Sequence, residues 1–128
     1  MESTFAACEN NVFYLVSGSM DTALKCTNGA FTILDSSKSE GAGEKHLPDV
    51  KADGNRIQVR VGSVLHPMSA EHSIEWIFLE TKKGGQFRRL TPDTEPVAEF
   101  LVAQGDEAVA AYAYCNLHGF WKTEICAS

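Results

Sequence analysis

Apolar and polar residues alternate through the segment Arg56-Ile57-Gln58-Val59-Arg60-Val61-Gly62-Ser63-Val64. This period of two is typical of a β-strand that turns one face toward a core and the other toward solvent. Further short segments, rich in β-branched and aromatic residues, predict more strands on both sides of it. They span residues 12–16, 31–34, 73–80, 87–90, 97–103, 108–115 and 119–123.

Turn-forming residues separate the later predicted strands at residues 82–85, 91–93 and 104–107. Short strands at regular spacing with turns between them favour an all-β fold, an antiparallel β-sandwich. A helix over residues 97–114 is the alternative, because this region is rich in alanine. The break at Gly105 and the aromatic residues near the end of the region favour two strands instead.

The first 37 residues differ from the rest, because their two short apolar runs lie among Ser, Gly and Asn residues. This pattern predicts a small N-terminal β appendage. Such a piece is too short to sustain its own core, so we expect it to dock on the remainder or on a partner chain. Residues 36–43 are small and polar, as in a linker. We therefore expect an appendage at residues 1–37 and the main domain at residues 38–128.

The chain has 128 residues, of which 44% are hydrophobic and 22% charged, as in a globular protein with a core. Its formal net charge of −6 and its lack of a basic cluster argue against nucleic acid as a partner. No apolar run is long enough to span a bilayer, and the N-terminus lacks the features of a secretory signal. These features predict a cytoplasmic protein without membrane attachment. An anionic substrate would need a local positive patch near its site.

Candidate metal ligands concentrate in three short motifs. His46 lies in residues 44–48, His66 and His72 in residues 66–72, and Cys115 and His118 in residues 115–119. These motifs contain every histidine of the chain and one of its four cysteines. Because thiols stay reduced in a protein that is not exported, metal binding or catalysis gains weight over disulfide formation.

Each motif alone has an ordinary explanation. A histidine beside proline is usually a loop residue, and a single Cys-x-x-His pair falls short of a zinc signature. Together, four imidazoles and one thiolate exceed the four ligands of structural zinc, and they match blue copper poorly. The set favours a square-pyramidal iron centre with one open face. Residue types alone leave open a zinc site that uses four of the five.

The three motifs resemble those of the desulfoferrodoxin and neelaredoxin family of superoxide reductases. The similar segments are Glu44-Lys45-His46-x-Pro48, His66-Pro67-Met68-x-x-Glu71-His72-x-Ile74-x-Trp76-Ile77 and Cys115-Asn116-x-His118-Gly119-x-Trp121-Lys122. The resemblance implies an immunoglobulin-like sandwich with one non-haem iron ion per chain, cycling between Fe2+ and Fe3+. It makes His46, His66, His72 and His118 the equatorial ligands. Cys115 becomes the axial thiolate opposite the open face.

The resemblance also implies a reaction. Superoxide receives one electron at the iron and leaves as hydrogen peroxide, and a rubredoxin-like donor restores the ferrous state without release of oxygen. Lys45 draws superoxide to the open face, and Glu44 is a sixth ligand of ferric iron that leaves on reduction. Rival functions are a non-catalytic iron- or zinc-binding protein on the same sandwich and a dismutase. Because metal binding alone needs neither Lys45 nor Glu44, their presence favours turnover.

Three further residues of the motifs receive interpretations. Met68 and Trp76 are interpreted as packing residues. The backbone of Asn116 is interpreted as a hydrogen-bond donor to the thiolate ligand, which would tune the potential of the iron.

Many relatives carry an N-terminal rubredoxin-type iron centre held by four cysteines. This chain has only Cys8 and Cys26 there, with Asn11 where the second residue of a Cys-x-x-Cys pair would stand. We interpret residues 1–37 as a desulforedoxin-like remnant without a metal site, which would serve to form a homodimer. A metal site shared between two chains is the alternative. Cys8, Cys26 and Cys126 are expected to be free thiols.

Overall fold

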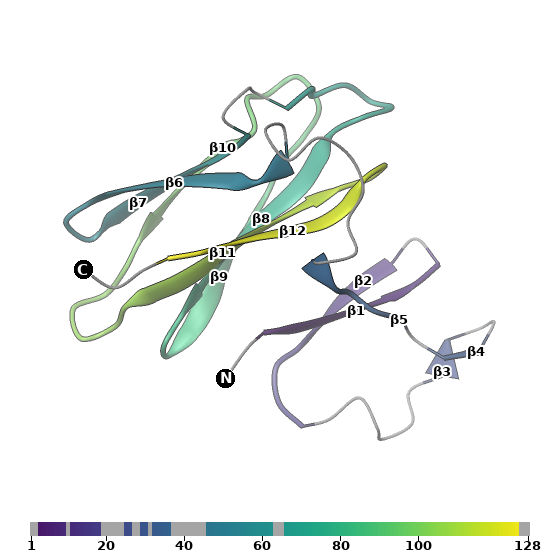
Figure 1. Ribbon diagram of the computed structural model, residues 1–128, viewed down its shortest axis with the longest axis horizontal. Helices are drawn as coiled ribbons and strands as arrows, with labels where there is room; N and C mark the ends of the chain where they lie inside the picture. The colour runs from purple at the N-terminus through teal and green to yellow at the C-terminus, as the bar shows by residue number, and fades with distance from the viewer. Residues whose placement is uncertain are drawn as a thin grey trace. The chain divides into compact units, whose positions relative to one another are not determined.

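The computed structural model describes residues 3–9, 11–18, 25–26, 29–30, 32–36, 46–62 and 66–125. The chain divides into two compact units, Met1–Asp35 and Ser36–Ser128. The described residues contain twelve β-strands, paired in antiparallel sheets, which confirms the predicted all-β fold (Figure 1). No helix among these residues is long and apolar enough to cross a membrane.

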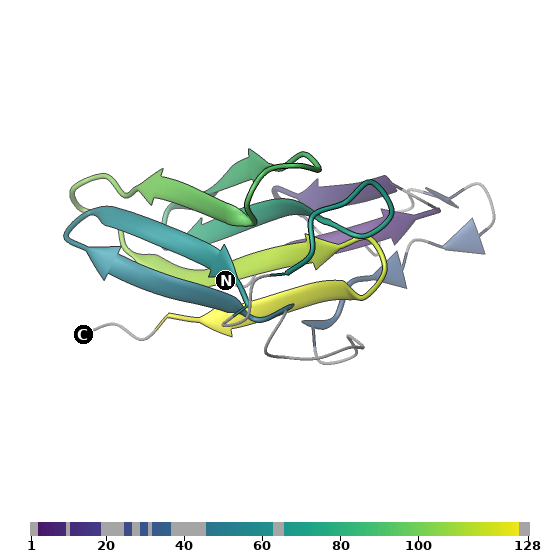
Figure 2. The same cartoon turned by 90° about the horizontal axis from the view of Figure 1, so that it is seen from above.

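The larger unit is a sandwich of two antiparallel sheets. One sheet has the order β10 (Val97–Leu101), β7 (Arg56–Val61), β6 (Pro48–Asp53). The other has the order β12 (Gly119–Glu124), β11 (Ala108–Cys115), β8 (Ile74–Thr81), β9 (Gly84–Arg89). The strands of both sheets run roughly alongside one another (Figure 2). Three and four antiparallel strands packed in this way make the immunoglobulin-like sandwich that was predicted.

The core lies between the two sheets. In β7 the buried residues are Ile57, Val59 and Val61, which are the apolar residues of the alternating segment. Phe100 of β10 joins them and is 1% exposed. The facing sheet contributes Ile74, Ile77, Leu79, Ala111, Ala113 and Cys115. Burial of this set removes apolar surface from water and is the main force that holds the sheets together.

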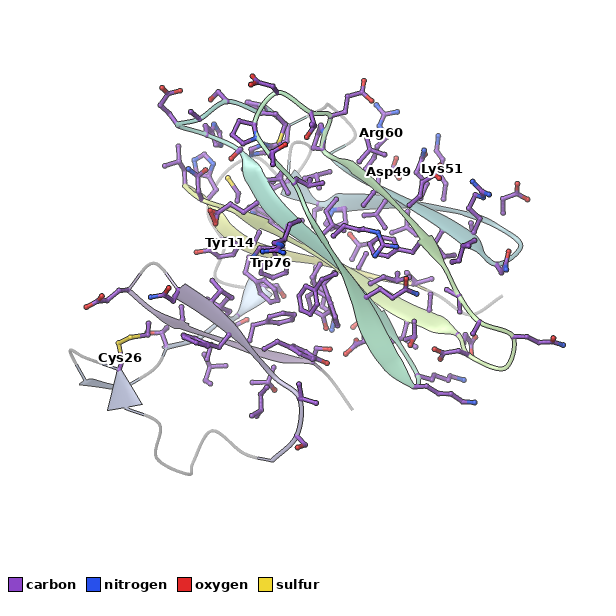
Figure 3. The ribbon with its side chains drawn as sticks, turned by 180° about the vertical axis from the view of Figure 1, so that it is seen from behind. Cys26, Asp49, Lys51, Arg60, Trp76 and Tyr114 are labelled. Atoms are coloured by element: carbon purple, nitrogen blue, oxygen red, sulfur yellow. A yellow bond between two sulfur atoms is a disulfide. The ribbon has the colours of Figure 1, made fainter. Side chains whose placement is uncertain are left out.

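The outer face of the four-stranded sheet carries a group of aromatic side chains. Trp76 of β8 stacks on Tyr114 of β11, with ring centroids 5.6 Å apart and planes 2° from parallel (Figure 3). Tyr112 stacks on Phe120 in the same way at 5.2 Å. Burial raises the pKa of Tyr114, with the negative charge of Glu75 adding to the effect. Trp76 therefore packs within this group, which agrees with its interpretation as a packing residue.

Residues 97–114 are two strands, as the sequence favoured, whereas strand β6 was missed. The helix alternative over residues 97–114 is wrong, because β10 and β11 occupy this region with a turn between them. Gly105 in that turn has φ of +90°, which glycine adopts readily and other residues do not. Strand β6 was not predicted, because in its sequence Pro-Asp-Val-Lys-Ala-Asp every second residue is charged and only Val50 is β-branched. As the outermost strand of its sheet order, β6 can keep charged residues such as Lys51 exposed.

The smaller unit contains a three-stranded sheet and a short two-stranded ribbon. The sheet has the order β2 (Asn11–Leu15), β1 (Thr4–Cys8), β5 (Thr32–Ile33), and the ribbon pairs β3 (Lys25–Cys26) with β4 (Gly29–Ala30). Phe5 and Ala6 of β1 are buried, and Phe5 packs on Tyr14 with ring centroids 5.0 Å apart.

Cys8 and Cys26 are joined by a disulfide, so the expectation of free thiols is wrong for both residues. The fold brings the end of β1 and the end of β3 together, with the two Cα atoms 5.5 Å apart, inside the range that a disulfide requires. The prediction failed because it rested on the redox compartment and not on the proximity of the two strands. Cys126 lies outside the described residues.

Candidate metal centre

The five predicted ligands lie at one end of the sandwich, where strands of both sheets begin or end. The start of β6 pairs with the end of β7, and the start of β8 pairs with the end of β11. Because neighbouring strands are antiparallel, the loops that leave these ends emerge side by side. His46 precedes β6, His66 and His72 lie between β7 and β8, Cys115 ends β11, and His118 lies in the β11–β12 turn.

The donor atoms of these side chains converge. One donor atom from each of His46, His66, His72, Cys115 and His118 lies within 4.8 Å of all the others. The distance from His46 Nε2 to His118 Nδ1 is 3.0 Å, and that from His46 Nε2 to His66 Nε2 is 3.1 Å. Cys115 Sγ lies 3.4 Å from His66 Nε2. The structure thus brings together all five residues in one cluster.

These distances fit a single shared ion. Imidazole nitrogens bind zinc-like ions at about 2.1 Å and thiolates at about 2.3 Å, so two donors at right angles lie about 3.0 to 3.1 Å apart. The two nitrogen–nitrogen distances match this value, and the sulfur–nitrogen distance exceeds it by a few tenths of an ångström. Donors on opposite sides of an ion lie about 4.2 to 4.4 Å apart, within the span of the cluster. The residues present can therefore hold a metal.

Burial prepares His66 and Cys115 as ligands. His66 is 3% exposed, and Cys115 is fully buried. The Nδ1–H of His66 donates a 2.6 Å hydrogen bond to the Pro67 carbonyl, which leaves the lone pair on Nε2, the atom that faces the cluster. The pKa of His66 is lowered to about 4, chiefly by burial and in smaller part by the charges of the other three histidines, although the Pro67 hydrogen bond acts to raise it. A neutral imidazole with a fixed tautomer is the form that binds a metal.

Trp121 of β12 supports two of the histidines. Its ring stacks on the His46 imidazole, with centroids 4.8 Å apart and planes 19° from parallel. Its Nε1–H donates a 3.2 Å hydrogen bond to the His118 carbonyl. Trp121 is 8% exposed, so its position is fixed by packing. Trp121 belongs to the third motif, but its role was not predicted, because its contacts depend on the β11–β12 turn.

Hydrogen bonds hold the loop that carries His72. The Ser69 N–H donates to the His72 carbonyl at 2.9 Å, and the His72 N–H donates to Ser69 Oγ at 3.2 Å. The Ile74 N–H donates to Met68 Sδ at 3.3 Å, and Met68 packs against the core. Met68 is therefore a packing residue, as interpreted. The role of Ser69 was not predicted, because a small polar residue in a loop carries no distinctive signal.

Asn116 ties the β11–β12 turn to the loop before β8. Its side-chain amide donates to the Glu71 carbonyl at 2.9 Å, and its Oδ1 accepts from the Ser73 N–H at 3.0 Å. Its backbone N–H donates to the Ser73 carbonyl at 3.2 Å, not to the Cys115 sulfur as the sequence interpretation had it. Asn116 thus fixes the positions of two ligand-bearing segments relative to one another.

Comparison with known proteins shows to which family the chain belongs. A family model described as Desulfoferrodoxin matches residues 38–124. The chain belongs to the desulfoferrodoxin family. It is 43% identical over 105 residues to a desulfoferrodoxin of Clostridium acetobutylicum, with 81% of each chain covered. It is 40% identical over 117 residues to a desulfoferrodoxin of Nitratidesulfovibrio vulgaris, with 91% of this chain and 90% of that one covered.

Solved structures agree with the desulfoferrodoxin assignment. The chain resembles the superoxide reductase from Treponema pallidum with a TM-score of 0.83 at 33% identity, covering 96% of this chain and 99% of that one. It resembles the superoxide reductase from Giardia intestinalis with a TM-score of 0.58 at 37% identity, covering 66% of this chain and 99% of that one. The resemblance drawn from the three motifs is therefore confirmed.

Two predicted site residues of this desulfoferrodoxin-family chain, Glu44 and Lys45, lie outside the described residues. Their roles stay predictions. Both immediately precede the described part of the ligand-bearing segment, which begins at His46.

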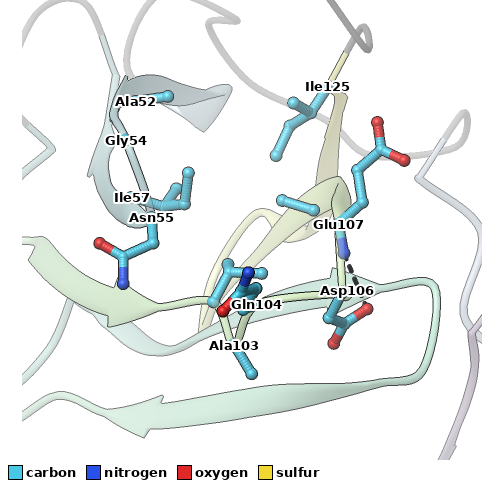
Figure 4. Close-up of a pocket in the computed structure, with 12 residues that line it drawn as sticks. Ala52, Gly54, Asn55, Ile57, Ala103, Gln104, Asp106, Glu107 and Ile125 are labelled. Atoms are coloured by element: carbon cyan, nitrogen blue, oxygen red, sulfur yellow. Dashed lines mark hydrogen bonds between the residues drawn. The ribbon is translucent and has the colours of Figure 1, made fainter.

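A separate depression of about 450 Å³ lies at the opposite end of the desulfoferrodoxin sandwich (Figure 4). The β6–β7 turn and the β10–β11 loop line it, with Ile57 and Ile125 among its apolar residues. Asp106 in this loop satisfies two backbone donors, because its Oδ1 accepts hydrogen bonds from the Glu107 and Lys83 N–H groups. Glu107 in turn forms an ion pair with Lys82. These interactions tie the β10–β11 loop to the β8–β9 turn, and the residues that line the depression include none of the candidate metal ligands.

The metal-free protein is expected to lose stability as the pH falls from 6.5 toward 4. The pKa of His66 is about 4 in the folded state against an ordinary value of 6.5, so the unfolded state binds the proton first. Its contribution, up to about 3 kcal/mol, is fully present above pH 6.5 and is lost on acidification through this window. Denaturant unfolding at several pH values measures it. A His66→Gln variant should show a smaller slope, and an equal slope in both proteins would contradict the assignment.

Proposed function

We propose that the chain reduces superoxide to hydrogen peroxide at a mononuclear non-haem iron centre. The ligands are His46, His66, His72, His118 and Cys115. Each superoxide takes up one electron and two protons, and an external rubredoxin-like donor then returns one electron. Bound iron supplies the electron and a free coordination position. The observation that carries this proposal is the convergence of four imidazoles and one thiol within 4.8 Å.

The composition of the donor set supports iron over zinc. Structural zinc takes four tetrahedral ligands, so five converging donors are one too many for it. Imidazole ligands suit iron, and a thiolate ligand raises the electron density on the metal. The four histidines add no charge, because the pKa of buried His66 lies near 4 and a metal takes the lone pair of each ring. A ferrous ion with one thiolate thus keeps a net charge of about +1.

This local charge helps an anion to approach a chain with a formal net charge of −6. Lys45, next to His46 in the sequence, adds a second positive charge near the site. In the proposal, Lys45 draws superoxide in and stabilises the negative charge on the reduced oxygen while protons arrive from water. Glu44 acts as the sixth ligand of the ferric ion and leaves on reduction.

Lys45→Ala is expected to slow superoxide capture by about tenfold at low ionic strength, because a nearby cation raises the encounter rate with an anion. The variant should also lose much of the salt dependence of capture. Stopped-flow kinetics at several salt concentrations measures both effects. Lys83→Ala, in the β8–β9 turn at the opposite end of the sandwich, removes the same charge and should behave as the unmodified protein. An unchanged rate for Lys45→Ala at low salt would refute the steering role.

Glu44→Ala is expected to leave the capture rate unchanged while altering the visible spectrum of the ferric protein. The reason is that the proposed carboxylate ligand binds after the electron has left the metal. Spectra of the oxidised protein at neutral pH measure the change. A ferric spectrum identical to that of the unmodified protein would remove Glu44 from the site.

The proposed function is tested by stopped-flow consumption of superoxide with metal analysis of the same sample. We expect about one iron per chain, one hydrogen peroxide per superoxide consumed and no oxygen release while a donor is present. Oxygen release at half the rate of superoxide loss would make the protein a dismutase. A site filled with zinc and no consumption would make it a metal-binding protein without turnover.

The proposal also covers the location of the protein, its oligomeric state and its electron donor. The proposal includes the cytoplasmic location predicted from the sequence, a homodimer formed through the N-terminal unit and a rubredoxin-like donor as the family resemblance implies. Sedimentation of the purified protein tests the dimer, and anaerobic reduction of the ferric protein by purified rubredoxin tests the donor class.

A further inference from the structure

The smaller unit contains a pair of cysteines that are not part of the metal cluster. Cys8 at the end of β1 and Cys26 in β3 form a disulfide across a sequence separation of 18 residues (Figure 3). This bond ties the three-stranded sheet to the β3–β4 ribbon. The pair belongs to the unit Met1–Asp35, whereas every residue of the metal cluster belongs to the other unit.

Exposure distinguishes these sulfurs from the ligand thiol. Cys8 and Cys26 are both half-buried, whereas Cys115 is fully buried beneath the histidines. Small oxidants and reductants can reach a half-buried sulfur, and thiol–disulfide exchange depends on such access. The pair is therefore the more reactive thiol site among the described residues.

The unit that holds the pair has little core to keep it closed. Its fully buried side chains among the described residues are Phe5 and Ala6. Strands β3, β4 and β5 are two residues long each. Units with few buried contacts open locally at low free energy, so a reductant can gain access without unfolding the sandwich.

We propose that Cys8 and Cys26 are a reversible dithiol–disulfide couple, closed by hydrogen peroxide and opened by an external dithiol reductant of the thioredoxin class. Solvent-accessible disulfides are the labile ones that serve catalysis or regulation, whereas buried structural disulfides resist reduction. The inference depends on the proposed function for the source of the oxidant alone, because superoxide reduction would release hydrogen peroxide from the same molecule.

The chemistry of the couple balances. One thiolate attacks an oxygen of hydrogen peroxide, the O–O bond breaks, and a sulfenic acid and hydroxide form; the hydroxide becomes water with the thiol's proton. The second thiol attacks the sulfenic sulfur, the S–S bond forms, and a second water leaves. The sum is two thiols and one peroxide giving a disulfide and two waters. Opening takes two electrons and two protons from the external dithiol, which becomes a disulfide itself.

Opening the couple has a structural consequence. It removes the covalent link between β1 and β3, so the β3–β4 ribbon is held by non-covalent contacts alone. Cleavage by a protease between residues 9 and 25 should become faster in the reduced protein. Cleavage within the sandwich at residues 46–125 should not change.

The test uses the full-length protein, with alkylation of free thiols followed by mass spectrometry. Dithiothreitol without denaturant should expose both Cys8 and Cys26 to alkylation, while Cys115 stays protected. After removal of the reductant under anaerobic conditions, one equivalent of added hydrogen peroxide should close the pair with a mass loss of two hydrogens. Cys8→Ser and Cys26→Ser should each abolish this closure. Iron-loaded protein given superoxide and a donor should close more of the pair per superoxide than metal-free protein, because reduction gives one peroxide per superoxide and spontaneous dismutation gives one per two. Added catalase should prevent closure in both.

Two results would overturn the couple. One is a pair that dithiothreitol opens only after the protein is unfolded, which would make the bond a permanent structural link. The other is a reduced pair that stays open with added hydrogen peroxide. Failure of the proposed function gives a different result, because iron-loaded protein would then close no more of the pair per superoxide than metal-free protein does, while added peroxide would still close it.

Discussion

Cys115→Ser is expected to remove the visible sulfur-to-iron charge-transfer band of the oxidised protein and to lower superoxide reduction by roughly 100-fold. Cys115 is fully buried, and its sulfur lies 3.4 Å from His66 Nε2. A serine hydroxyl at this position stays protonated more readily than a thiol and is a weaker donor to iron. The four histidines remain, so part of the iron should stay bound. The oxidised spectrum, iron content and stopped-flow rate of one preparation measure the three effects.

Cys126→Ser is the control for this substitution, because Cys126 belongs to none of the ligand motifs. It should keep the band, the iron and the rate. A charge-transfer band that persists in Cys115→Ser would remove Cys115 from the metal centre. Loss of the band in both variants would point to a general effect of cysteine replacement and would equally contradict the assignment.

Phe100→Ala is expected to lower the free energy of unfolding of the sandwich by about 3 to 5 kcal/mol, because it leaves a cavity in the core. Phe100 is 1% exposed and packs between the sheets, and the Arg88 guanidinium lies 4.8 Å from its ring centroid. Denaturant unfolding of the metal-free protein measures the loss. The metal-free form is the one to use, because bound metal adds its own binding free energy to the stability.

Leu101→Ala is the matched control, since Leu101 is the next residue of β10 and points to the opposite face. Leu101 is 59% exposed, so its removal should change the free energy of unfolding by about 0.5 kcal/mol or less. Equal losses for the two variants would mean that β10 does not turn alternate residues inward, and the sandwich described above would be wrong.

The sandwich could be predicted where local pattern and tertiary environment agree. Strand β7 is half-buried and alternates, so its apolar residues Ile57, Val59 and Val61 identified its inner face. Strands β8 and β11 are buried on both faces, so their long apolar runs predicted strands without showing which face meets the core. Strand β6 escaped prediction because its apolar residues are few and alternate with Asp49, Lys51 and Asp53. Strand β1 escaped because its sequence Thr-Phe-Ala-Ala-Cys contains two alanines, which do not favour strands, whereas β2 of the same length is rich in Val, Phe and Tyr.

The candidate site could be predicted in its membership but not in its geometry. The motifs identified the donor types, and their order resembled that of a known family. The meeting of His46 with His118, 72 residues apart in sequence, depends on antiparallel strand ends that no local pattern reveals. The supporting contacts of Trp121 and Asn116 depend on the same ends, and so does the disulfide between Cys8 and Cys26 on the ends of β1 and β3. Contacts between loops that are distant in sequence arise from the tertiary structure and leave no local sequence pattern.

X-ray absorption at the iron edge of the reduced protein tests most directly whether the five side chains share one iron ion. The account predicts one iron per chain, surrounded by four nitrogen neighbours and one sulfur neighbour, with the sulfur contribution missing in Cys115→Ser. An iron shell without sulfur in the unmodified protein, or with four sulfur neighbours, would contradict it.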